Sequence, residues 1–332
     1  LDYQGGEHAR LGVFHLFKEF RIASYRIILS AEGRGFNLPQ HKGSLFLDKK
    51  FQDILLGYSC KISSKKCSDC FLNLRCPYAA FYEKIVSNLW SSRGFGPLPA
   101  PFSWQLPLEK KTEYITGEDV FFKLNLFGDA INYLEIFIRT LQDFAAEGSR
   151  TGINKFIIKE VIAENPISGE IQLVFKDTEN RIAKTDLIIS GEDIEKWAKQ
   201  KTLVKRLSLL FLTPTLLRED GSFLQEPLFD VIIKKLLMKI SALYYFYHQR
   251  KEMDFFYQGL IDKAKEVQKV KDLSRFVSWE KEIKGQFYWG GLLGKVEYTG
   301  ILQEFFPLLK LGEFLHLGEN IPFGFGRYRM DI

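Results

Sequence analysis

Residues 290–330 decide the fold and read GGLLGKVEYTGILQEFFPLLKLGEFLHLGENIPFGFGRYRM. Apolar, β-branched and aromatic residues over 292–298 predict a strand. Residues 302–315 have the apolar spacing of a helix, and residues 323–330 are expected to form the last strand. The end of the chain is therefore predicted to be a strand–helix–strand unit.

Glycines and a basic residue gather in the last part of this unit, at Gly318, Gly324, Gly326 and Arg327. Glycine lets a backbone approach a ligand closely or adopt a positive φ. Amide groups freed in this way can face phosphate oxygens. We therefore predict that this segment presents amides and a guanidinium to an RNA, with a tight turn into an edge strand as the alternative.

The same alternation of elements fills the rest of the chain. Strands are expected at residues 21–31, 120–127, 155–162 and 207–212. Amphipathic helices are expected over 131–144, ended by Gly148, and over 228–248. Residues 254–285 are charged and show no clear period. Two successive units predict an α+β protein with two tandem ferredoxin-like domains.

Length and charge limit the classes of protein that fit. A chain of 332 residues can hold two domains, placed here at 20–200 and 201–332 after an N-terminal extension over 1–19. The net charge is +5 (46 basic minus 41 acidic residues), which suits a polyanionic partner without requiring one. The sequence shows neither a membrane-length apolar run nor a secretion signal, so a cytoplasmic protein is expected.

All four cysteines lie close together, at Cys60, Cys67, Cys70 and Cys76, in an insertion over about 58–80 of the first domain. A C-x2-C pair inside such a cluster is typical of a four-thiolate metal site. Structural zinc is the preferred ligand, with an iron–sulfur cluster as the lesser alternative and two disulfides as another. Four thiolates leave no open position, so no catalytic metal is expected.

The helix over 228–248 carries Lys234, Lys235 and Lys239 away from its apolar positions. These lysines predict either an RNA-binding stripe or an ordinary solvated helix face.

Several motifs together resemble a known family. They are GGLLGKVEYTG at 290–300, PLLKLG at 307–312, HLG at 316–318, FGFGRY at 323–328, FLTPTLL at 211–217, and the cysteine cluster with the following Pro77-Tyr78. Over roughly residues 36–330 the chain resembles the CRISPR precursor-RNA-processing endoribonucleases of the RAMP superfamily, in a branch with a four-cysteine, metal-binding insertion.

That resemblance implies two RRM-like ferredoxin folds and a glycine-rich loop on CRISPR repeat RNA. His316 would join Gly318, Gly324, Gly326 and Arg327 in holding the RNA, and subunits of a CRISPR effector complex would be further partners. Such antiviral nucleases cut each repeat once, without metal. A ribose 2′-OH attacks the adjacent phosphate and leaves a 2′,3′-cyclic phosphate.

This chemistry needs a base for the 2′-OH and a cation for the charge that develops on phosphorus. His41 follows the first strand, where the family often places its base, and Lys42 can offset the phosphate charge. The alternative for His41 is a surface-loop histidine.

Two other functions stay open at this point. The pair Leu47-Asp48 stands where the family usually has Arg-Gly, and Glu319 stands where it often has Lys. The missing basic residues favour a non-catalytic RAMP subunit that binds repeat or guide RNA. The cysteine cluster also allows a zinc-ribbon protein that binds DNA.

Overall fold

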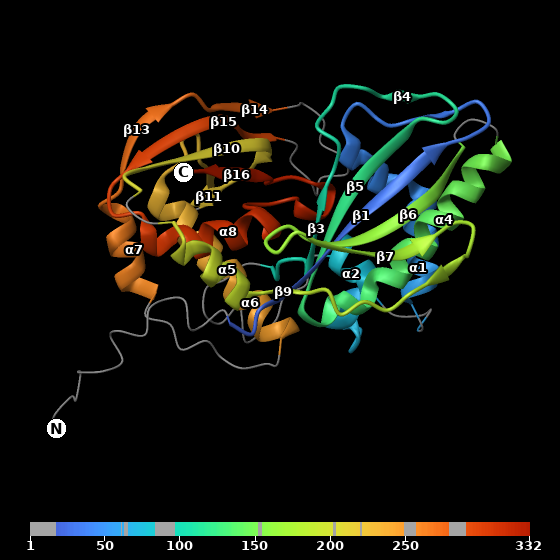
Figure 1. The fold of residues 1–332 in the computed structure, drawn as a ribbon, viewed down its shortest axis with the longest axis horizontal. Coiled ribbons are helices and arrows are strands. Elements are labelled where there is room, and N and C mark those ends of the chain that lie inside the picture. Colours follow the sequence, from blue (N-terminus) through green and yellow to red (C-terminus); the bar gives the residue numbers. More distant parts are fainter. Residues whose placement is uncertain are drawn as a thin grey trace.

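Two antiparallel sheets stand side by side, each covered by helices on one face (Figure 1). The computed structural model describes residues 18–60, 62, 66–83, 97–151, 155–201, 204–219, 221–248, 257–278 and 290–332. Among the described helices, none combines the length and apolar content needed to cross a membrane.

The first sheet has seven strands. In spatial order they are β3 (Phe102–Gln105), β5 (Asp119–Phe127), β1 (Arg21–Ala31), β6 (Phe156–Asn165), β7 (Glu170–Lys176) and β8 (Arg181–Ile182), with β9 (Ile189–Ser190) also on β1. Its helices are α1 (Lys49–Ser59), α2 (Pro77–Tyr82) and α4 (Leu134–Thr151). The order β3-β5-β1-β6 is that of a ferredoxin-like fold. Helix α4 continues past Gly148, so the predicted helix end there is wrong.

The second sheet has five strands. They are β13 (Gln268–Asp272), β15 (Gly290–Thr299), β10 (Arg206–Thr215) and β16 (Tyr328–Asp331) in spatial order, with β14 (Arg275–Ser278) also on β15. Its helices are α5 (Gly191–Lys199), α6 (Phe229–Tyr247), α7 (Tyr257–Lys265) and α8 (Phe306–Leu315). The path β10, α6, β13, β15, α8, β16 repeats the ferredoxin-like order, so the prediction of two tandem folds is confirmed.

Short elements complete the described chain. Two small ladders pair β2 (Phe36–Asn37) with β4 (Glu113–Tyr114) and β11 (Arg218–Glu219) with β12 (Ser222–Phe223). The 3-10 turns are η3 (Lys42–Leu47), η4 (Cys67–Asp69), η5 (Asn73–Arg75), η6 (Gly128–Tyr133), η7 (Gln303–Phe305) and η8 (Ile321–Phe323).

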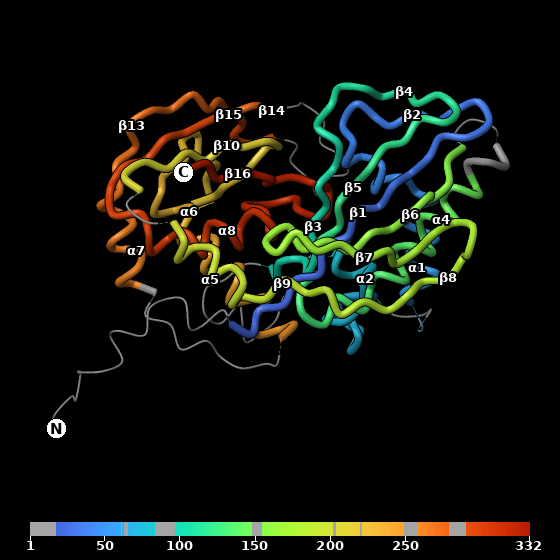
Figure 2. Tube along the Cα trace, in the orientation of Figure 1, coloured from blue at the N-terminus to red at the C-terminus, as the bar shows by residue number. Residues whose placement is uncertain are grey.

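The two hydrophobic cores exchange residues. Phe20 directly precedes β1 and Ile189 lies in β9 of the first sheet, but both pack in the core under the second sheet. Phe323 and Phe325, near the end of the chain, pack in the core under the first sheet. Figure 2 traces the C-terminal segment from the second sheet toward β3, which is where these two rings are buried. The halves therefore hold each other through side chains as well as through surface contact.

Candidate functional site

The glycine-rich segment links α8 to β16 through repeated left-handed backbone. Positive φ angles occur at His316 (61°), Gly318 (89°), Asn320 (58°), Gly324 (81°) and Gly326 (75°). A Cβ on Gly326 would stand 2.0 Å from the Leu317 carbonyl oxygen, and one on Gly318 would stand 2.3 Å from that of Leu216. These glycines are needed because the segment folds tightly on its own protein.

Several amides of this segment are already bonded within the protein. The Gly326 amide donates to the Pro214 carbonyl over 2.9 Å, and the Arg327 amide donates to the Thr213 hydroxyl over 2.9 Å. The Gly324 amide donates to Ile321 inside its own turn. The prediction that the amides of this stretch face phosphate is therefore wrong for these three. The strand predicted over 323–330 also begins later, at Tyr328, because η8 occupies 321–323.

Both domains hold the carbonyl end of α8. Ser103 donates from its hydroxyl to the Phe314 carbonyl over 2.6 Å, and the Asn125 amide donates to the same oxygen over 3.2 Å. From α6, the Lys239 ammonium donates to the carbonyls of Leu315 and His316. A cation is favourable at a helix C-terminus, where carbonyls lack intrahelical partners. The start of the glycine-rich segment is thus anchored from two sides.

His316 and Arg327 lie inside this structure. His316 is fully buried and its Nδ1 lies 2.9 Å from the Phe325 carbonyl oxygen. Arg327 is half-buried, and its guanidinium donates to the carbonyl of Leu106, the residue after β3, over 3.4 Å. Burial lowers the pKa of Arg327. His316 therefore positions the loop, which is the structural alternative to RNA contact. Gly324 and Gly326 are also buried, while Gly318 is partly exposed.

The buried His316 predicts a specific pH dependence. Burial, helped by the charges of Lys239 and Arg327, lowers the pKa of His316 from 6.5 to about 3. Below about pH 6.5 the unfolded chain takes up a proton that the folded chain does not, so the free energy of unfolding falls as the pH falls. From pH 6.5 to pH 5 this residue alone should cost about 2 kcal/mol. In urea unfolding of His316→Asn, the free energy of unfolding should fall less steeply between pH 6.5 and pH 5 than in the wild type. An unchanged dependence on pH would refute this prediction.

His41 lies at the point where the first domain meets the glycine-rich segment. It is exposed, caps η3, and its carbonyl accepts hydrogen bonds from the Ser44 amide (2.8 Å) and hydroxyl (2.7 Å). Two residues on, a Cβ on Gly43 would stand 2.1 Å from the Phe323 carbonyl oxygen of η8. The contact between η3 and η8 therefore brings His41 beside the glycine-rich segment.

Lys42 is held differently from His41. Its side chain is buried, its ammonium donates to the Lys111 carbonyl, and burial lowers its pKa. It stays a candidate cation, one residue from His41, and must turn from Lys111 to reach a phosphate.

The predicted basic stripe of α6 is divided among three environments. Lys234 forms an ion pair with Glu219 over 3.3 Å, and Lys235 is half-buried at a cavity between the domains. Lys239 is buried, so the stripe is not one exposed surface. Helical periodicity could not reveal this, because the carbonyl end of α8 comes from a distant part of the chain.

The four cysteines all line one small cavity, of about 30 Å³. Cys60 caps the end of α1, Cys67 begins η4, Cys70 follows it, and Cys76 caps α2. All four thiols are free, so the disulfide alternative is not seen here. Burial raises the pKa of Cys67 and of Cys76, opposite to an activated thiolate. Within the described ranges, no three His, Cys, Asp or Glu side chains are arranged to hold a metal, so zinc stays a prediction.

Two family models match the chain. A model described as an N-terminal domain matches residues 20–187, which is half of the chain, and one described as CRISPR-associated endoribonuclease Cas6 matches residues 209–328. Residues 209–328 are a Cas6 domain, of the CRISPR-associated endoribonuclease family. Neither description mentions a four-cysteine insertion, so that part of the resemblance stays a prediction. No curated protein matches the chain in sequence.

Solved structures share the fold at low identity. Cas6 of Thermus thermophilus is 15% identical, with a TM-score of 0.50 over 94% of this chain and 99% of that one. A Cas6 product complex is 16% identical, with a TM-score of 0.50 over 93% of this chain and 100% of that one. A partial Cas6-RT-Cas1–Cas2 complex is 10% identical, with a TM-score of 0.56, and the chain covers 47% of that longer chain. These likenesses support the tandem ferredoxin-like fold of the chain.

Sequence reasoning missed the residues that hold the loop. Ser103 and Asn125 are buried polar side chains within strands, and their partner is a backbone carbonyl about 200 positions away in the chain. A polar residue in an otherwise apolar strand was the one available signal, and it does not identify its partner.

Proposed function

We propose that the chain cuts CRISPR repeat RNA once per repeat by transesterification, without a catalytic metal. The observation that carries this is the close contact of η3 with η8, which sets the exposed His41 beside the glycine-rich segment. An exposed imidazole can take a proton from a ribose 2′-OH when the RNA lies across this junction.

The proposed step balances within the RNA and the protein. The 2′-oxygen forms a bond to the adjacent phosphorus while its proton passes to His41. The bond from phosphorus to the 5′-oxygen breaks, and that oxygen gains a proton from an acid of the site or from water. Lys42 offsets the extra negative charge in the transition state once it leaves the Lys111 carbonyl. The products are a 2′,3′-cyclic phosphate and a 5′-hydroxyl.

A cleavage assay in chelator tests this function. With excess EDTA, the wild-type chain should cut a repeat RNA at one site, and mass spectrometry should find a cyclic phosphate at the new 3′ end. A repeat with 2′-deoxyribose at the cut nucleotide should not be cut, because it lacks the nucleophile. A requirement for Mg²⁺, or cutting of the deoxy substrate, contradicts the mechanism. Tight binding with no product at enzyme excess selects the non-catalytic RAMP subunit.

Other CRISPR subunits are proposed as further partners. The support is the solved complex whose name joins Cas6 with Cas1 and Cas2, although only its fold is shared with this chain.

We also propose that the four cysteines hold a structural zinc ion. The support is that all four cysteines line one small cavity, and four thiolates are a donor set that zinc prefers. Elemental analysis should find about one zinc per chain, and the double variant Cys67→Ser/Cys70→Ser should lose it together with several degrees of Tm. The control Ser68→Ala changes an exposed residue of the same turn and should keep both. A double variant with unchanged Tm removes the structural role, and bound iron instead of zinc selects the iron–sulfur alternative.

A further inference from the structure

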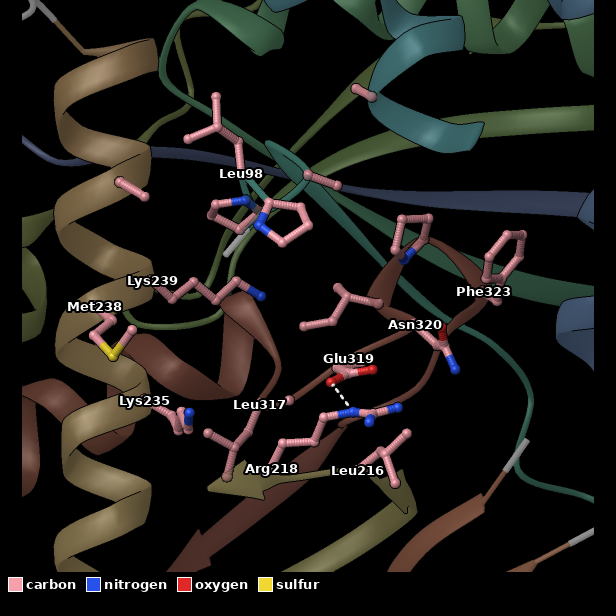
Figure 3. Close-up of a pocket in the computed structure, with 18 of the residues that line it drawn as sticks. Leu98, Leu216, Arg218, Lys235, Met238, Lys239, Leu317, Glu319, Asn320 and Phe323 are labelled. Carbon is pink, nitrogen blue, oxygen red and sulfur yellow. Dashed lines mark ion pairs between the residues drawn. The ribbon is translucent and has the colours of Figure 1, made fainter. Parts of the chain in front are cut away.

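A cavity of about 550 Å³ lies between the two domains, beside the glycine-rich segment (Figure 3). Its walls come from five places: the end of α2 (residues 80–83), residues 97–100, residues 216–218, the face of α6 with Met238 and Ala242, and residues 317–323. Neither His41 nor Lys42 lines it. The volume is that of a small-molecule site, and such sites are common between domains.

Lys239 is the buried charge of this cavity. Only 9% of the residue is exposed, and its amine points into the space between α6 and the glycine-rich segment (Figure 3). An ammonium has three N–H donors, and the two acceptors that Lys239 reaches are the backbone carbonyls of Leu315 and His316. No acidic side chain in the described segments forms an ion pair with it, and burial lowers its pKa well below the usual value. A buried ammonium without a carboxylate is stabilised when an anion binds beside it.

The polar rim adds positive charge near Lys239. Lys235 lies one turn earlier on α6 and also lines the cavity. Arg218 also lines the cavity, where it forms an ion pair with Glu319 over 2.7 Å (Figure 3). The charged residues that line the cavity are three basic ones, Arg218, Lys235 and Lys239, and two acidic ones, Glu83 and Glu319. The cavity as a whole favours a ligand with negative charge.

The remaining wall is apolar and partly aromatic. Phe81 and Tyr82 from α2 line the cavity together with Leu98 and Pro99, and Figure 3 shows Leu98 and Phe323 on different sides of it. Flat apolar surface of this kind suits a nucleobase, since bases stack on rings regardless of their sequence. An anion site and an apolar wall in one cavity together match a phosphate joined to a base.

We propose that this cavity binds one unpaired nucleotide, with its phosphate on Lys239 and Lys235 and its base against the wall of Leu98 and Pro99. The inference rests on the proposed function, because the expected source of that nucleotide is the substrate RNA. A free nucleoside monophosphate has the same chemistry and is the second source to be tested.

The test measures binding of an uncleavable repeat RNA, with 2′-deoxyribose at the cut nucleotide, to the full chain. Lys239→Met removes the buried charge, and Met238→Trp fills the cavity while leaving the bonds of Lys239 to the α8 carbonyls in place. Each variant should raise Kd about tenfold. Lys196→Met is the matched control, since it removes an exposed lysine of α5 that pairs with Glu192 away from the cavity, and its Kd should stay within about twofold.

The outcomes separate the possible results. Weaker RNA binding by Met238→Trp, with wild-type Tm, supports a nucleotide of the RNA, and this variant decides if Lys239→Met fails to fold. Unchanged RNA binding, combined with a rise in wild-type Tm on adding AMP or UMP that Met238→Trp abolishes, supports a free nucleotide. Unchanged RNA binding with no response to AMP or UMP overturns the proposal. Because this assay needs no cutting, failure of the proposed function appears separately, as intact all-ribose repeat RNA in the chelator assay.

Discussion

Replacing His41 by alanine is expected to lower the single-turnover rate of repeat-RNA cleavage by about 10²–10⁴-fold, the usual contribution of a general base. The imidazole is exposed at the start of η3, so its removal should leave the fold and the affinity for uncleavable RNA close to wild type. The measurement is the rate at saturating enzyme in EDTA, with Kd and Tm determined in parallel.

The control for this experiment is Gln40→Ala, a truncation of the exposed neighbouring residue. It should cut within about twofold of the wild-type rate. If His41→Ala cuts as fast as Gln40→Ala, then His41 is not the base and the proposed mechanism fails at its first step.

The second large effect is expected from Gly43→Ala. The added methyl would stand 2.1 Å from the Phe323 carbonyl oxygen, and a backbone atom cannot give way as a flexible side chain can. Separating η3 from η8 should cost about 1–3 kcal/mol of stability, as overpacking does. Cleavage should fall by at least about tenfold, because a shift of about 1 Å in a catalytic group can cost about 10²-fold.

Gly57→Ala is the matched control for Gly43→Ala. Gly57 lies in α1 with nothing within 4 Å of the position of a Cβ, so the same chemical change meets open space. Alanine there should raise the free energy of unfolding by about 0.5–1 kcal/mol and leave cleavage unchanged. Equal activity of the two variants would show that the η3–η8 contact does not position the site.

Strands and helices with strong periods were predictable from the sequence. Strand β1 and helix α6 bury apolar side chains at the intervals that their geometry requires, so pattern and structure coincide. Strand β13 was not predicted because it lies at an edge of the second sheet and is mostly exposed, so packing places little demand on its side chains. Helix α7 and strand β14 lie in the same charged region and were missed with it.

The site was less predictable than the fold. Glycines in a C-terminal segment suggested amides open to phosphate, yet Gly318 and Gly326 are required by contacts with the protein's own carbonyls. Lys239 is charged and was predicted at a surface, but its partners are the carbonyls at the end of α8. Both errors have one cause: a local pattern does not show which distant backbone will arrive beside it.

The exchange of apolar residues between the two cores bears on how such proteins diversify. Phe323 and Phe325 fill space under the first sheet, while Phe20 and Ile189 fill space under the second. In a chimera that joins one domain of this chain to the other domain of a distant relative, the exchanged side chains would therefore not fit the cores that receive them. New RNA preferences should consequently arise by substitution and loop change within one intact lineage, and seldom by recombination at the boundary between the two folds.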